Sequence, residues 1–330
     1  MAFDPMKSFL EEMSLPEQLL EVYSTLLSCC SSNDLENLKI ASTALKILAI
    51  INRNLSILEL SWVVALGTTQ HVTTVDALAK LVDHQRVMRL IHQFIAHVEF
   101  RDVRKHQVRL VHQSVKEFVL KNFVSNQPWR HGPISREPDD MILDQRYESL
   151  QAFILDICAR YLLLEDIGRR TLFSEELVAI AELPQGSDIF NDNEGSIEYD
   201  GHCTWDAWEE DMINFDPTDR GFREFFVYAS CHWLNHFCTI TAEHIPSLET
   251  IEKICQAGST RLSNWIQQNC RPGCTLTPRF EFESSLYDPL SITSLYGSVA
   301  MLRDMLENSS FDKNGFLEQS AMRAAHEIFR

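Results

Sequence analysis

The chain has 330 residues, of which 45% are hydrophobic and 23% are charged, as in ordinary globular proteins. Its first residues lack the charged-then-apolar pattern of a signal peptide. A membrane helix needs a run of roughly 20 apolar residues, and the two best candidate segments are interrupted by Lys46 and Glu59. The nine cysteines, an odd number spread along the chain, favour reduced thiols over a disulfide framework. We therefore expect a cytoplasmic protein, with the nucleus as the other allowed compartment, and no membrane partner.

The net charge of −18 is concentrated in one part of the chain. Residues 1–126 carry no net charge and residues 246–330 carry −2, whereas residues 127–245 carry −16. Such an acidic segment repels nucleic-acid phosphates and anionic lipids. A solvated surface is the usual explanation of a charged segment, and we expect no nucleic acid to bind there.

Three helices are predicted in the first 70 residues. Apolar residues at helical spacing predict helices over 15–30 and 35–51, with a polar turn between them. Ser56 followed by Glu59 is the pattern of a capping box, which predicts that a third helix begins directly after the serine. Gly67 is expected to end that helix.

After a less regular segment from Val75 to Ile95, the spacing of the apolar residues changes from a helical to a strand-like pattern. Residues 95–100 and 108–112 alternate between apolar and polar side chains, which predicts two strands joined by a basic turn. A helix follows at once, with Ser114 as the expected N-cap and Glu117 completing a capping box. Helices, one β-hairpin and a further helix are the plan of a winged-helix domain. We place this domain at residues 35–125, after a lead-in helix within residues 1–34.

The middle of the chain, residues 126–280, is expected to be an acidic helical linker domain. Proline and glycine predict irregular segments over 125–145 and 183–204, and helical spacing resumes from Tyr147 to Leu162. The aromatic-rich segment 222–237 predicts a helix at the centre of this domain's core.

The C-terminal residues 281–330 contain an internal repeat. The segment Asp288–Thr293 aligns with Ser320–Ala325 at an offset of 32 residues, close to the ankyrin period of about 33 residues. We expect a first helix that ends at Gly297 and a second helix that presents Leu302, Met305 and Leu306 to a neighbour. One such helix pair cannot bury both of its faces, so it would need further repeats stacked against it. The predicted fold class is therefore mainly α: a winged-helix domain with one β-hairpin, then a helical domain that runs into ankyrin-like helix pairs, truncated at the end of the chain.

Several segments resemble one family. Val108–Phe118, with the sequence VRLVHQSVKEF, is similar to the strand-to-helix signature of the winged-helix domain named after GPI inositol-deacylase-like proteins. That domain occurs in fungal NACHT-type ankyrin-repeat proteins, and the resemblance is strongest over residues 15–123. Further segments that resemble helices of these proteins are Leu15–Tyr23, Ala44–Leu48, Leu55–Leu60, Cys158–Leu162 and Phe226–Trp233.

The resemblance implies a role in intracellular signalling. In that family an upstream NACHT domain binds ATP or GTP, the winged helix packs on it as part of a nucleotide-controlled switch, and the ankyrin repeats recognise a partner. A NACHT domain is thus implied as one partner of the winged helix. This sequence contains no Gly-x-x-x-x-Gly-Lys-Ser/Thr segment, so no nucleotide-binding residue is carried over. We expect a downstream fragment of such a receptor or scaffold, or a relative that lacks the NTPase, without a cofactor.

Three groups of residues could suggest a metal site, and each has a simpler explanation. Cys270 and Cys274 lack the second close pair of a zinc site. His232 and His236 share one helical face, but the glutamate of the metalloprotease motif is missing, so we expect satisfied core or surface histidines. The acidic segment 205–211 lacks the alternating carboxylates and the glycine of a calcium loop. We expect no bound metal.

No enzyme is expected either, because His112 and Ser114 lack the Gly-x-Ser-x-Gly elbow of a hydrolase. Two functions remain: a non-catalytic regulatory and protein-interaction module that binds a protein through its ankyrin-like C-terminal region, and a winged-helix regulator that binds nucleic acid. The neutral charge of the winged-helix domain favours the first, and we expect its basic turn to contact the acidic middle segment or a protein before DNA. The residues expected to bind a partner are Tyr287, Asp288, Tyr296 and Arg303 near the C-terminus, and Arg101, Arg104 and Lys105 on the wing.

Overall fold

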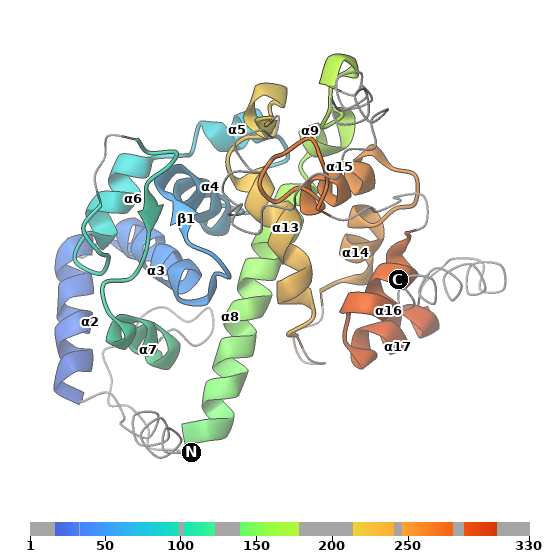
Figure 1. Cartoon of the computed structure of the whole chain (residues 1–330). Helices are drawn as coiled ribbons and strands as arrows, with labels where there is room; N and C mark the ends of the chain where they lie inside the picture. Colours follow the sequence, from blue (N-terminus) through green and yellow to red (C-terminus); the bar gives the residue numbers. More distant parts are fainter. Residues whose placement is uncertain are drawn as a thin grey trace, which may run out of the picture.

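A computed structural model describes residues 17–32, 34–98, 102–122, 139–177, 214–240, 246–279 and 287–308. This part of the chain is mainly helical, which confirms the predicted class at that level (Figure 1). No helix within these ranges is long and apolar enough to cross a membrane. The short helices that connect the larger elements are α5 (Val75–Ala79), α9 (Glu165–Arg169), the 3-10 turn η1 (Pro217–Arg220) and α14 (Leu248–Ile254).

The N-terminal unit is built from helices that begin and end near the predicted residues. Its larger helices are α2 (Glu17–Ser31), α3 (Leu35–Ile50), α4 (Ile57–Thr68), α6 (His84–Ile91) and α7 (Gln113–Asn122). The predicted capping box of α4 is confirmed: Ser56 Oγ accepts the N–H of Glu59 at 3.1 Å, and the Glu59 carboxylate accepts the N–H of Ser56 at 2.8 Å. The local sequence is therefore sufficient to fix where α4 begins.

The strand pairing around the basic turn differs from the predicted hairpin. β1 (Leu55–Ser56) pairs antiparallel with β2 (Gln107–Val108), and a single bridge joins Ile95 to Leu110. The segment before α4 thus supplies a strand that the sequence analysis did not predict, because two residues are too few to show an alternation. Residues 99–101, on the predicted first strand and its turn, lie outside the described residues.

The cap of α7 is also different from the prediction. The N–H groups of Ser114 and Val115 donate to Nδ1 and to the carbonyl oxygen of His112, each at 3.1 Å, so His112 caps the helix. Ser114 lies inside the first turn, and its hydroxyl is hydrogen-bonded to the Tyr23 hydroxyl at 2.7 Å. The predicted capping box of Ser114 and Glu117 is therefore wrong, and the serine instead ties α7 to α2.

Two long helices form the middle of the described chain (Figure 1). α8 (Asp139–Leu162) begins directly after Pro138, so the end of the predicted irregular segment 125–145 is helical. α13 (Phe225–Phe237) confirms the predicted aromatic helix, and its Phe225, Phe226, Tyr228, Trp233 and Phe237 are all buried. The segments 125–138, 183–204 and 205–211 fall outside the described residues.

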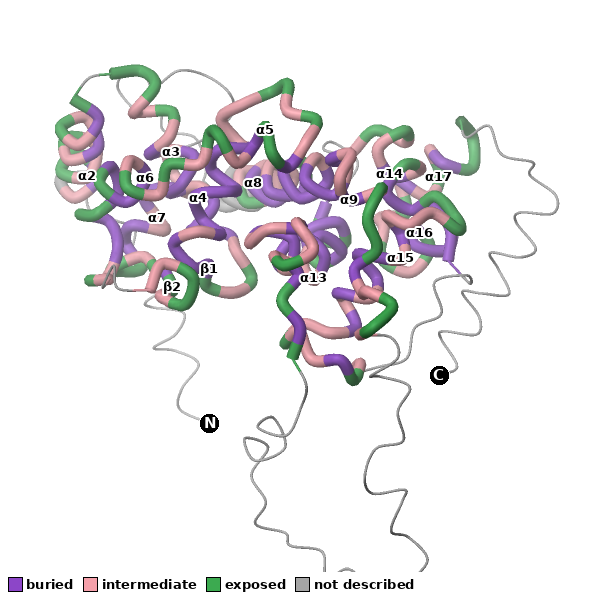
Figure 2. Tube along the Cα trace, turned by 90° about the horizontal axis from the view of Figure 1, so that it is seen from above, coloured by how far each residue is buried: buried purple, intermediate pink, exposed green. Residues whose placement is uncertain are grey.

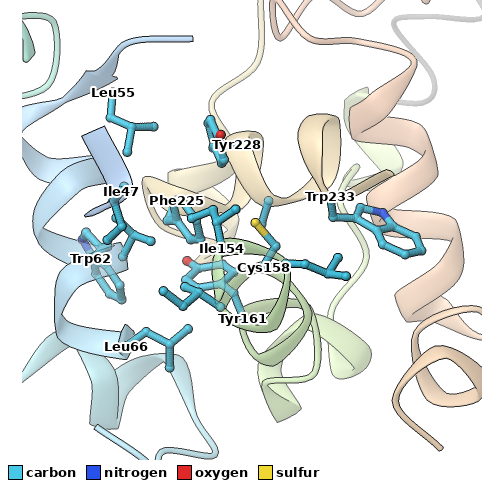
Figure 3. Packing of buried hydrophobic residues seen from close by; sticks show 14 of the residues in the cluster. Ile47, Leu55, Trp62, Leu66, Ile154, Cys158, Tyr161, Phe225, Tyr228 and Trp233 are labelled. Atoms are coloured by element: carbon cyan, nitrogen blue, oxygen red, sulfur yellow. The ribbon is translucent and has the colours of Figure 1, made fainter. Parts of the chain in front are cut away.

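The two units share one core. α8 packs against α3 and α4, and α13 packs against α4. Figure 3 shows side chains of the N-terminal unit in contact with those of α8 and α13. Tyr161 stands at the junction: its ring lies 6.4 Å from that of Trp62 and 5.2 Å from that of Phe225, and its hydroxyl donates to the carbonyl of Phe222 at 2.6 Å. A relative movement of the units would therefore expose apolar surface, which is costly.

The C-terminal helices lie at the end of the molecule opposite α2 (Figure 2). α15 (Thr260–Asn269) packs on α13, and α16 (Pro289–Tyr296) is followed by α17 (Val299–Asn308). Asp288 caps the start of α16. The helix ends at Gly297, as the sequence predicted, and the N–H of Gly297 donates to the carbonyl of Thr293 at 2.8 Å. The proposed second repeat, from residue 320, lies outside the described residues.

Candidate interaction surfaces

The turn of residues 102–106, which the sequence predicts to be the wing, completes the N-terminus of α4. The carbonyl of His106 accepts the N–H of Ile57 at 3.1 Å, and the carbonyl of Val103 accepts the N–H of Leu58 at 3.2 Å. The first N–H groups of a helix have no partner within the helix and must be satisfied from outside. The wing is thus fixed by backbone hydrogen bonds to α4.

Arg104 joins this turn to the start of α13. Its guanidinium lies 3.5 Å from the carboxylate of Glu224 and 3.8 Å from that of Asp216. Glu224 is only 12% exposed and immediately precedes α13, where the helix dipole also favours a negative charge. The predicted contact between the basic wing and the acidic middle segment is therefore confirmed for Arg104. Lys105 is exposed and has no ion pair with a described residue, and Arg101 lies outside the described residues.

A second polar contact lies at the same junction. Two nitrogens of the Arg53 guanidinium contact the two carboxylate oxygens of Glu59, at 2.9 and 2.5 Å. The same guanidinium lies 5.3 Å from the centre of the Tyr228 ring, within the range of a cation–π contact. The capping residue of α4 is thereby connected to α13.

A chain of buried hydrogen bonds continues from Tyr228 to α8. Its hydroxyl accepts the N–H of Asn52 at 3.2 Å and lies 3.0 Å from Nε2 of His236, whose Nδ1 lies 2.5 Å from Oε1 of Gln151. Because the amide oxygen can only accept, Nδ1 must carry the proton and Nε2 must accept from the tyrosine. Burial, and then the neighbouring His232, lowers the pKa of His236 to about 3. His236 is therefore neutral near pH 7 and acts as a structural link.

The other candidate ligands do not form a metal site in the described residues. His232 is half-buried, and burial, followed by the charge of Arg53, lowers its pKa to about 4. Burial likewise raises the pKa of Cys231 to about 12, so this thiol is protonated near pH 7. Within the described ranges, no group of three or more histidine, cysteine, aspartate or glutamate side chains has the geometry to hold a metal ion.

The C-terminal surface is different from the one that the sequence analysis predicted. Tyr287 and Asp288, which we expected on an exposed face, are 1% and 0% exposed. The carboxylate of Asp288 accepts the N–H of Ser291 at 2.8 Å, because this residue is the N-cap of α16. Tyr296 and Arg303 are exposed, as expected.

α17 presents one apolar face to solvent. Val299 is 74% exposed and Leu306 is 36% exposed, with the half-buried Leu302 between them. Met301 and Met305 point to the other side of the helix and are buried, so Met305 packs against neighbouring elements; of the three residues expected to face a neighbour, Leu306 is the exposed one. The helical spacing alone could not distinguish these two faces, because apolar residues occur on both.

No protein-family model matches this sequence, and comparison with curated proteins and with solved structures finds no match. The function of the chain must therefore be inferred from the wing, the junction with α13 and the exposed face of α17.

Proposed function

We propose that this chain is a non-catalytic regulatory and protein-interaction module. In this proposal the winged-helix unit and the helical unit behind it form one support, and α16 and α17 present the surface that binds a partner protein. The observation that carries the proposal is the exposed apolar face of α17, with Val299 74% exposed beside Leu306. Single exposed apolar side chains are ordinary, so the proposal depends on Val299, Leu302 and Leu306 lying together on one helical face.

The shared core supports the role of a rigid support. Three contacts cross between the two units: the ring contact of Tyr161 with Trp62, the guanidinium of Arg53 over the ring of Tyr228, and the hydrogen bond from the N–H of Asn52 to the Tyr228 hydroxyl. Such contacts hold a distant binding surface in a fixed orientation to the wing. The resemblance to NACHT-associated winged-helix domains adds the proposal that the winged-helix unit packs on a nucleotide-binding domain, in the cytoplasm or the nucleus.

Nucleic-acid binding through the wing is the alternative function. Lys105 and Arg109 are exposed there and could contact phosphates. The pairing of Arg104 with Asp216 and Glu224 speaks against it, because these carboxylates neutralise part of the basic surface and would repel a phosphate backbone.

An affinity pull-down from cell extract, with and without nuclease, tests the proposal. The full chain is compared with a Val299→Asp/Leu306→Asp variant and with an Arg104→Glu/Lys105→Glu variant. Leu35→Asp is the matched control, since Leu35 is 78% exposed but lies at the start of α3, far from α17 (Figure 2).

Partners that are lost with the α17 variant, retained by Leu35→Asp and indifferent to nuclease support a protein-docking module. Partners that survive the α17 variant, but disappear with nuclease or with the wing variant, contradict it and favour the nucleic-acid alternative.

A further inference from the structure

The exposed face of α17 carries one cation among its apolar side chains. Val299, Leu302 and Leu306 follow one another at spacings of three and four residues, and the exposed Arg303 lies next to Val299 at the edge of this stripe. Arg303 forms no ion pair with any described residue. Glu307 is one helical turn away, but no ion pair joins the two side chains.

The size of this face limits what can cover it. A helix of 10 residues is about 15 Å long, and a stripe about 10 Å wide along it offers on the order of 150 Å². A stable dimer needs about 800 Å² on each partner, so a second copy of this chain would not be held by this face alone. A single short helix laid along α17 matches both its length and the spacing of its apolar residues.

The charge then selects among short helices. Burying Arg303 beneath a partner without a counter-charge would leave an unpaired cation, which is strongly unfavourable, whereas a carboxylate opposite it would satisfy the guanidinium. A basic or purely apolar helix would therefore be discriminated against.

We propose that the face formed by Val299, Leu302, Arg303 and Leu306 binds a short amphipathic helix of a partner protein that places a carboxylate against Arg303. This inference rests on the proposed function and names the chemistry of the partner at the same surface. The small area makes the complex weak and reversible, as expected for a regulatory contact.

A displayed peptide library tests the inference with the full chain. The peptides have about 16 residues, or some four helical turns, with leucines at helical spacing and with Glu, Lys, Gln or Ala at the positions beside them. Selections are carried out in parallel on the wild type, on Arg303→Glu and on Val299→Asp. Arg89→Glu on α6 and Leu35→Asp on α3 are exposed controls elsewhere.

We expect the wild type to enrich peptides with glutamate next to the leucines, and Arg303→Glu to enrich lysine there instead. The selected acidic peptides should bind Val299→Asp and Arg303→Glu at least about tenfold more weakly, which is a difference of about 1.4 kcal/mol. Both controls should bind them as the wild type does.

One outcome would overturn the inference and leave the proposed function standing. In that outcome the selected peptides require Val299, but the peptides selected on the wild type and on Arg303→Glu have the same charged residues. If no selected peptide depends on Val299, the short-helix partner is excluded. The pull-down above then decides separately whether α17 binds a larger protein surface or no protein.

Discussion

Acidification is expected to destabilise this protein through His236. In the folded chain its ring lies between Tyr228 and Gln151, and burial, followed by the charge of His232, lowers its pKa to about 3. In the unfolded chain the pKa of a histidine is about 6.5. Between these pH values the unfolded state binds more protons than the folded state. The free energy of unfolding therefore rises with pH in this range, and the stability contributed by His236 is lost as the pH falls.

The size of the effect follows from these two pKa values. At pH 5 the unfolded side chain is almost fully protonated and the folded one is not, which lowers the free energy of unfolding by about 2 kcal/mol relative to pH 7.5. That is a substantial share of the roughly 5–15 kcal/mol that stabilises a typical domain. His232 acts in the same direction, with a smaller contribution because it is partly exposed.

Urea unfolding followed by circular dichroism at the two pH values measures the effect. His236→Gln should be less stable than the wild type at pH 7.5, since the hydrogen-bonded chain is broken, but its loss between pH 7.5 and pH 5 should be about 2 kcal/mol smaller. His71→Gln, at an exposed histidine, is the matched control. If His236→Gln and the wild type lose the same free energy on acidification, the assignment of His236 as a buried neutral link is refuted.

Three further substitutions test the caps and the wing. Gly297→Ala would place a Cβ atom 2.6 Å from the carbonyl oxygen of Thr293 and should cost about 1–3 kcal/mol in thermal unfolding, whereas Gly273→Ala, with no neighbour nearer than 4.0 Å, is the control. Glu59→Ala should lower the free energy of unfolding in urea by about 2–3 kcal/mol, because the Arg53 guanidinium and the N–H of Ser56 both lose their acceptor. An unchanged free energy of unfolding would show that water replaces the carboxylate. Arg104→Ala should lower the free energy of unfolding by less than about 1 kcal/mol, since this side chain is 57% exposed. The difference from the wild type should vanish at high salt, and a larger loss that does not depend on salt would contradict a surface ion pair.

The elements that could be predicted from the sequence are those whose signals lie within a few residues. Ser56 and Glu59 satisfy each other's backbone N–H groups three residues apart, so the start of α4 is contained in four residues of sequence. The end of α16 at Gly297 and the buried aromatic face of α13 follow from local patterns in the same way. Even so, the helical spacing in α17 identified a helix without showing which of its two apolar faces remains exposed.

The tertiary structure alone decided the contacts between distant segments. β1 pairs with β2 across the whole of α4 to α6, and His236 reaches Gln151 although 85 residues separate them. Burial of Asp288 and the pairing of Arg104 with Glu224 likewise depend on which helix surfaces meet. The physical reason is the range of the interactions. Helix caps form between residues one turn apart, and the apolar periodicity of a helix is visible within a few turns of sequence. Burial and ion pairing between distant segments depend on which helix surfaces pack together and are removed from water, and neighbouring residues do not specify that packing.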